Sequence, residues 1–156
     1  MPAYFKMTWD RELETGIREV DRQHQGIVDS INTLVEAQGT GDNLRVKKVI
    51  QGLTDYTLSH FQFEEELMTR AGYPSIVGHK RIHALFVKKV QEFNERVQNG
   101  DDVSGEVIVT LQRWLVTHIK TEDRDYVSAI LEKMPELAGD SSEGSWLTRT
   151  RKRFFG

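Results

Sequence analysis

Five histidines and two carboxylates recur at intervals that place them on the inner faces of predicted helices. His60 and Glu64 are four residues apart, and so are His79 and His83. Side chains four residues apart in a helix lie on the same face, one turn from each other, so each pair can bind the same metal centre. The remaining members of the set are His24, His118 and Asp123.

A metal site explains this set of histidines better than a set of separate hydrogen bonds does. All five histidines of the chain fall on predicted inner stripes. Each buried polar group without a partner costs about 1–3 kcal/mol, and the centre of an apolar bundle offers few partners. A metal would use the lone pairs as ligands. Imidazole together with carboxylate favours iron, with zinc and manganese as rivals.

The spacing between His118 and Asp123 is five residues, which does not align on a regular α-helix. We therefore expect a kink or a helix end just after Ile119, which would turn the carboxylate of Asp123 inward.

The number of ligands indicates a dinuclear site with one open position. Two six-coordinate metals offer twelve positions. Five imidazoles, two bridging carboxylates and one bridging oxo or hydroxo group fill eleven of them. Such a site can admit one small ligand.

The elements that must position these residues are four long amphipathic helices. Apolar residues recur at helical spacing, and glycines cluster between the helical segments. Asp21 is the expected N-cap of the first helix. Short loops between amphipathic helices predict an all-α fold, an antiparallel up-down-up-down four-helix bundle. The expected helices span about residues 21–38, 43–70, 75–98 and 103–133.

Two further segments flank the bundle. The first 20 residues are expected to form an ordered arm that packs across it through Tyr4, Phe5 and Trp9. Residues 139–156 form a basic and aromatic tail, so we divide the chain into a bundle domain, 1–138, and the tail. Self-packing or disorder of the tail is favoured over contact with a protein partner, and membrane contact is not expected from one short basic run.

Composition excludes several other classes of protein. The 156 residues include 21 Lys and Arg against 24 Asp and Glu, for a net charge of -3, which does not suit a nucleic-acid-binding protein. The chain has no cysteine, so disulfide scaffolds, thiolate zinc sites and iron–sulfur clusters are excluded. The N-terminus lacks the apolar core of a secretory signal, and we expect a cytoplasmic protein.

The ligand pattern resembles that of the hemerythrins. His24, His60-x-x-x-Glu64, His79-x-x-x-His83 and His118-x-x-x-x-Asp123 match the family's ligand signature in order and approximate spacing. The matching stretch covers about residues 7–130, and the Trp9-Asp10 pair resembles the bacterial branch of the family, the bacteriohemerythrins. The tail has no counterpart in this core motif.

The resemblance implies reversible dioxygen binding at a non-haem di-iron centre, for storage, delivery or sensing. The cofactor would be two iron ions (Fe2+/Fe3+) with a bridging oxo or hydroxo group. His79, His83 and His118 would hold one iron, and His24 and His60 would hold the iron with the open position. The bridging ligands would be Glu64 and Asp123.

The resemblance also implies an apolar oxygen pocket. An apolar wall keeps protons and anions away from bound oxygen, although the same residues also serve as ordinary core. Glu65 is a candidate acceptor for a histidine N–H, although a solvated position is favoured for Glu65 and Glu66, and Tyr126 is a candidate for a contact with a bridging carboxylate. The expected pocket residues are Ile27, Phe61, Trp114, Leu115 and Ile119.

Three alternatives remain open at this stage. A di-iron redox enzyme or sensor that consumes oxygen, peroxide or nitric oxide is the main one, although oxygen-activating ferritin-like sites contain mostly carboxylates. A dinuclear zinc or manganese hydrolase would need an open substrate cleft. A sensory module would need a partner protein that binds the tail in response to oxygen or iron binding. The expected activity is binding rather than enzymatic turnover, with weak oxidase or peroxidase activity as the exception.

Overall fold

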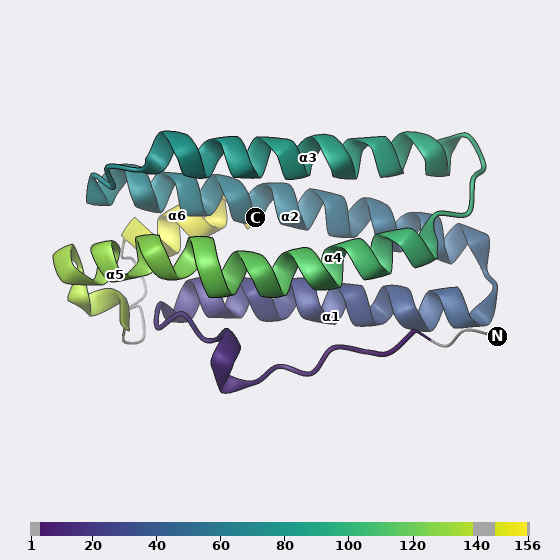
Figure 1. Cartoon of the computed structure of the whole chain (residues 1–156), viewed down its shortest axis with the longest axis horizontal. Helices are drawn as coiled ribbons and strands as arrows, with labels where there is room; N and C mark the ends of the chain where they lie inside the picture. The colour runs from purple at the N-terminus through teal and green to yellow at the C-terminus, as the bar shows by residue number, and fades with distance from the viewer. Residues whose placement is uncertain (1–3, 139–145, 156) are drawn as a thin grey trace.

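The computed structural model describes residues 4–138 and 146–155 as a bundle of antiparallel helices. Figure 1 shows α1 to α4 side by side, with α5 prolonging α4. The predicted four-helix bundle is thus confirmed. The α-helices are α1 (Arg18–Thr40), α2 (Asn43–Ala71), α3 (Ile76–Gln98), α4 (Ser104–His118), α5 (Arg124–Lys133) and α6 (Trp146–Phe155).

Local capping explains where α1 and α2 meet. Gly41 follows α1 with a φ of 73°, a left-handed conformation that glycine adopts without strain. The side chain of Asp42 then accepts a hydrogen bond from the backbone N–H of Arg45 and begins α2. The start of α1, in contrast, differs from the prediction. The helix begins at Arg18, and Asp21 is not its N-cap, because its carboxylate accepts hydrogen bonds from the backbone N–H groups of Thr15 and Gly16 instead.

The last helix of the bundle is one rod with a π-helical turn in its middle. This turn, η2 (Ile119–Asp123), joins α4 to α5. In a π-helix the backbone bonds link residues five apart, so His118 and Asp123 point to the same side. The expected kink or helix end after Ile119 is therefore replaced by a change of helical pitch that leaves the rod continuous (Figure 1).

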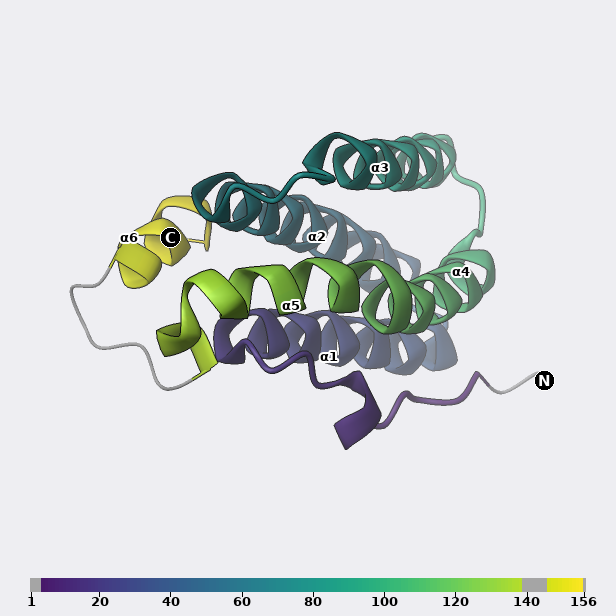
Figure 2. The same cartoon turned by 60° about the vertical axis from the view of Figure 1, so that its left-hand side comes forward.

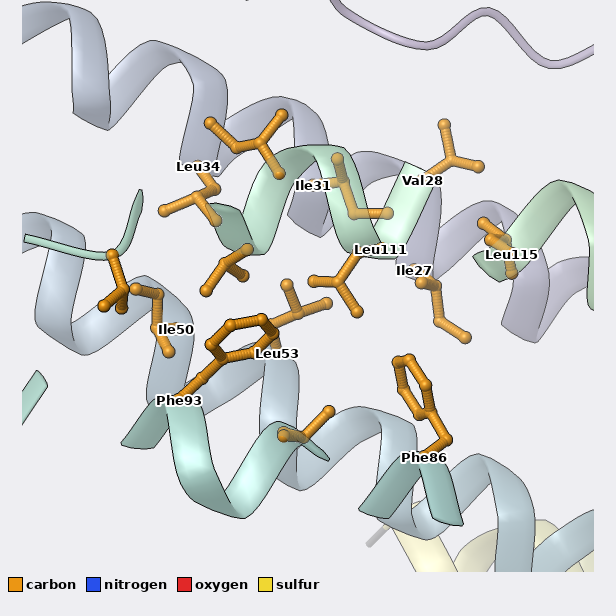
Figure 3. Close-up of a cluster of buried hydrophobic side chains, with 14 of the residues drawn as sticks. Ile27, Val28, Ile31, Leu34, Ile50, Leu53, Phe86, Phe93, Leu111 and Leu115 are labelled. Carbon is orange, nitrogen blue, oxygen red and sulfur yellow. The ribbon is translucent and has the colours of Figure 1, made fainter. Parts of the chain in front are cut away.

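The apolar core consists of two separate clusters. The larger one fills the half of the bundle toward the α1–α2 and α3–α4 connections, and Figure 3 shows its side chains converging from all four helices. It includes Ile31, Leu53, Phe93 and Leu111. The smaller cluster contains Phe63, Leu67, Met68, Tyr126 and Ile130. The seven buried histidines and carboxylates belong to neither cluster.

The N-terminal arm, which the structure describes from Tyr4 onward, runs along the outside of α1 (Figure 1). Asn32 fixes it, because its side chain accepts from the N–H of Met7 and donates to the carbonyl of the same residue. Tyr4 and Trp9 pack against the larger apolar cluster as expected. Phe5 does not, since 84% of its surface is exposed, and only its carbonyl is bonded, to Gln112.

After the short 3-10 helix η3 (Pro135–Ala138), the chain returns as α6, which lies beside α2 (Figure 2). Phe155 packs on Tyr56 and Phe63 with ring centroids 5.2 and 6.4 Å away. The first part of the tail, 139–145, and with it the boundary between the two expected domains, lies outside the described residues. Among the described helices, none is both long and apolar enough to cross a membrane.

Candidate metal centre

The structure brings all seven predicted ligand side chains together at one level of the bundle. Each is 5% exposed or less. Their nitrogen and oxygen atoms form two groups that share Glu64: one with His24 and His60, the other with His79, His83 and His118. Every helix of the bundle supplies at least one member: α1 His24, α2 His60 and Glu64, α3 His79 and His83, and α4 His118.

Glu64 lies between the two groups. Its Oε1 is 3.4 Å from Nε2 of His24, and its Oε2 is 3.2 Å from Nε2 of His83. The same Oε2 lies 3.6 Å from Nε2 of His79 and 3.7 Å from Nε2 of His118. Each carboxylate oxygen therefore faces a different group of histidines, which is the arrangement of a bridging ligand.

Asp123 spans the same two groups from the end of the π-helical turn. Its Oδ2 is 3.1 Å from Nε2 of His24, and its Oδ1 is 3.0 Å from Nε2 of His118 and 3.8 Å from Nε2 of His79. On a regular α-helix the five-residue spacing would turn this side chain away from His118. The π-helical turn is thus what brings the second carboxylate to the centre.

The polar atoms at the centre are better placed to bind a metal ion than to form hydrogen bonds with one another. Although they lie close together, several of them make no hydrogen bond of acceptable geometry to any residue that the structure describes. A buried polar atom left in this state is costly unless something else uses its lone pair. The atoms concerned are Oε2 of Glu64, both carboxylate oxygens of Asp123 and Nε2 of His79 and His83.

Electrostatics reinforce the same conclusion. Burial by itself opposes ionisation of Glu64, but the imidazoles, His60 foremost, hold the pKa of its carboxyl well below the usual range. Burial also lowers the pKa of the imidazoles, yet Asp123 and Glu64 outweigh it and raise the pKa of His24 to about 9. The carboxylate of Asp123 likewise raises the pKa of His118 to about 10 against the effect of burial. Burial and Glu64 oppose ionisation of Asp123 as well, but His118 and His24 lower the pKa of its carboxyl, so both carboxyls favour the ionised form that attracts cations.

Two histidines have polar neighbours outside the centre. Nδ1 of His60 lies 2.8 Å from Oε1 of Gln23, a residue that the sequence reasoning did not single out. Because an amide oxygen only accepts, Nδ1 carries the proton and Nε2 presents its lone pair to the centre. Nδ1 of His83 is 3.5 Å from Oε2 of Glu65, but the two atoms form no hydrogen bond, so the expectation that Glu65 orients a histidine stays a prediction.

The expected pocket residues all belong to the larger apolar cluster or pack against it. Phe61 stacks on His83 with ring centroids 3.9 Å apart, and Trp114 stacks on His118 at 4.7 Å. The two rings thus cover the group of three histidines, which is expected to bind the iron without the open position. The remaining pocket residues are Ile27, Leu115 and Ile119, all fully buried.

A surface groove of about 430 Å³ lies between α3 and α4 and reaches the same aromatic wall. Its lining includes Ile82 from α3, and Arg113, Trp114 and His118 from α4. Tyr126 lies on the other side of the centre, with its ring 5.2 Å from that of His79. Burial and the neighbouring carboxylates raise the pKa of this phenol well above its usual value.

Comparisons with known proteins agree with this geometry. A family model described as "Hemerythrin HHE cation binding domain" matches residues 15–130, a range that contains all seven side chains. A bacteriohemerythrin of Pseudomonas paraeruginosa is 48% identical over 150 residues, which cover 96% of this chain and 98% of that protein. A bacteriohemerythrin of Stenotrophomonas maltophilia is 43% identical with the same coverage.

More distant relatives share the bundle but less of the chain. A myohemerythrin of Theromyzon tessulatum is 30% identical over 118 residues, which cover 76% of this chain and 88% of that protein. The crystal structure of a wild-type hemerythrin superposes with a TM-score of 0.76 at 30% identity, and it covers 80% of this chain and 97% of that structure.

Proposed function

The chain belongs to the hemerythrin family, which is known for oxygen binding at a di-iron site, and we propose that this protein binds dioxygen reversibly at such a centre. The observation that carries the proposal is the pair of histidine groups joined by Glu64 and Asp123, whose inward-facing atoms include several without hydrogen bonds. The role would be storage, delivery or sensing of oxygen.

In this proposal the seven side chains together bind two iron ions. His79, His83 and His118 would bind one ion, His24 and His60 the other, and the two carboxylates would bridge them. The iron pair would supply the two electrons that dioxygen binding requires. Dioxygen would bind on the side of the centre that His24 and His60 hold, because this side has fewer histidine ligands.

The chain's own residues would keep the centre dry and fixed. Ile27, Leu115 and Ile119 are fully buried, and in this proposal they would exclude water and anions, which favours reversible binding over irreversible oxidation. Gln23 fixes the tautomer of His60, so that its Nε2 stays available as a ligand. In this proposal the protein is a binding protein, with dioxygen as its partner, rather than an enzyme.

The test is an optical spectrum of the reduced, iron-loaded full chain, cycled between argon and oxygen, with iron measured on the same sample. We expect a charge-transfer band that appears with oxygen and disappears under argon, at two irons per chain. One-way conversion to a ferric protein would contradict reversible binding and would favour a di-iron enzyme or sensor that consumes oxygen or peroxide. Binding of zinc or manganese in preference to iron would contradict the choice of metal.

A further inference from the structure

Glu19 is a buried carboxylate that is not one of the seven proposed metal ligands. Only 4% of its surface is exposed, although it lies in the first turn of α1. Its Oε1 accepts a hydrogen bond from Nε2 of Gln23 at 3.3 Å. Because Oε1 of Gln23 accepts in turn from Nδ1 of His60, an unbroken chain of polar contacts leads from Glu19 to the metal centre.

The outer oxygen of Glu19 faces two arginines from different parts of the chain. Arg22, one turn further along α1, donates to Oε2 at 2.9 Å and is 59% exposed. Arg151 of α6 places its NH1 3.9 Å from the same oxygen. A buried carboxylate needs such partners, because removing them leaves an uncompensated charge. The C-terminal helix is therefore one of the elements that hold Glu19 in place.

The position of Arg151 depends on how α6 docks. Phe155, one turn later, packs on Tyr56 and Phe63 of α2. At the other end of the helix, the guanidinium of Arg70 lies 4.6 Å from the ring centre of Trp146. These contacts fix α6 against the bundle at both ends, with Arg151 between them.

We propose that α6 supports the metal centre through Arg151, Glu19 and Gln23, which together orient His60 and hold its Nδ1 proton. Glu19 and Arg151 are positioning residues in this chain of contacts, since they act on His60 through Gln23. The path from Arg151 ends at His60, so it affects only the metal site that His24 and His60 form. This inference rests on the proposed function only in requiring that the centre binds metal ions.

The experiment measures stepwise Co2+ binding to the metal-free full chain by competition with a chelator. His60→Ala and His83→Ala identify the two binding steps, because each removes a ligand from one site only. Arg151→Met removes the charge of Arg151 and keeps an unbranched side chain. Lys152→Met is the matched control, because Lys152 is the exposed neighbour on the same helix, and Arg151→Lys retains the charge.

We expect a graded loss of affinity at the site that contains His60. Gln23→Leu should weaken Co2+ binding there by about 10–100-fold, the range for a residue that orients a metal-bound histidine. Arg151→Met should weaken it by about two- to fivefold, as for one partly exposed ion pair. Arg151→Lys should restore most of the loss. The site with His79, His83 and His118 should keep its affinity.

The decisive comparison is the double variant. If Arg151 acts through Gln23, Arg151→Met should have no further effect once Gln23 is replaced by Leu. Where Gln23→Leu fails to fold, Glu19→Gln serves as the second background. The proposal is overturned if Arg151→Met behaves as Lys152→Met does, if it weakens both sites equally, or if its effect persists in the double variant.

The outcome is separate from that of oxygen binding. Co2+ affinity tests only the path from α6 to His60, whereas cycling the iron-loaded protein between argon and oxygen tests reversible binding. A protein that oxidises irreversibly but shows the graded Co2+ affinities would retain the role of α6 and lose the proposed function.

Discussion

Glu64 and Asp123 approach the same two histidines from different helices, and each directs one oxygen to each of them. Oε1 of Glu64 and Oδ2 of Asp123 lie 3.4 and 3.1 Å from Nε2 of His24. The other two oxygens lie 3.7 and 3.0 Å from Nε2 of His118. Each carboxylate therefore links the two halves of the centre by itself, and neither can replace the other without moving its helix.

This pairing predicts that loss of either carboxylate prevents paired metal binding. Glu64→Ala and Asp123→Ala should each reduce iron from two ions per chain to one or none, because each removes a ligand from both sites. Iron content and the optical spectrum after reconstitution measure the effect. Asp125→Ala is the control, since this exposed carboxylate lies two residues after Asp123. Full occupancy by two irons in either variant would contradict the bridging roles.

The π-helical turn predicts unequal effects of a deletion and an insertion. Deleting Thr121 leaves His118 and Asp123 four residues apart, a spacing that a regular α-helix aligns, so binding of two metals should survive. Inserting an alanine after Thr121 makes the spacing six, which neither helix type aligns, and Asp123 should turn by about 100° away from the centre. Iron stoichiometry measures both. Equal effects would contradict the role of the turn.

The aromatic wall predicts a change in chemistry without a loss of metal. Trp114 lies stacked between Phe86, at 3.8 Å, and His118. Trp114→Leu should keep two irons but speed irreversible oxidation of the reduced protein severalfold, because the shield over the histidine is reduced. The rate is followed optically in air. Val109→Ala, on the rim of the same groove, is the control. An unchanged rate would mean that Trp114 only fills space.

The docking of α6 predicts a contribution to stability. Phe155→Ala removes two aromatic contacts and should lower the free energy of unfolding by about 1–2 kcal/mol. The corresponding fall in the melting temperature is roughly 2–8 °C. Thermal unfolding followed by circular dichroism measures it, with the exposed Lys152→Ala as control. A melting temperature equal to that of the control would show that α6 is not held by this ring.

The ligand set was accessible from sequence because spacing within one helix fixes the direction of a side chain. His60 and Glu64 point the same way whatever surrounds their helix, and so do His79 and His83. The start of α2 near residue 43 was accessible because the glycines before it interrupt the helical pattern. The start of α1 was not, because Asp21 forms its hydrogen bonds with Thr15 and Gly16 in the preceding loop rather than with its own helix.

Features that depend on the distance between helices could not be predicted. Nothing in the sequence distinguishes Gln23 from other polar residues of α1, because its role arises only where α1 packs against His60 on α2. Which ring covers which histidine depends on packing in the same way. The interval of five residues between His118 and Asp123 showed that a regular α-helix could not align the two side chains. The spacing alone does not distinguish a kink from a π-helical turn, because either one can bring Asp123 to the side of His118.

The placement of α3 has a consequence for how the centre is assembled over time. This helix packs along α2 (Figure 2), and it meets α4 through side chains, among them Phe86, whose ring stacks on that of Trp114. The other helices can therefore associate first and bring together five of the seven ligands. His79 and His83 arrive only when α3 docks. In kinetic terms, we expect the site with His24 and His60 to acquire its metal first, and the docking of a single helix to limit the rate at which the second metal is captured.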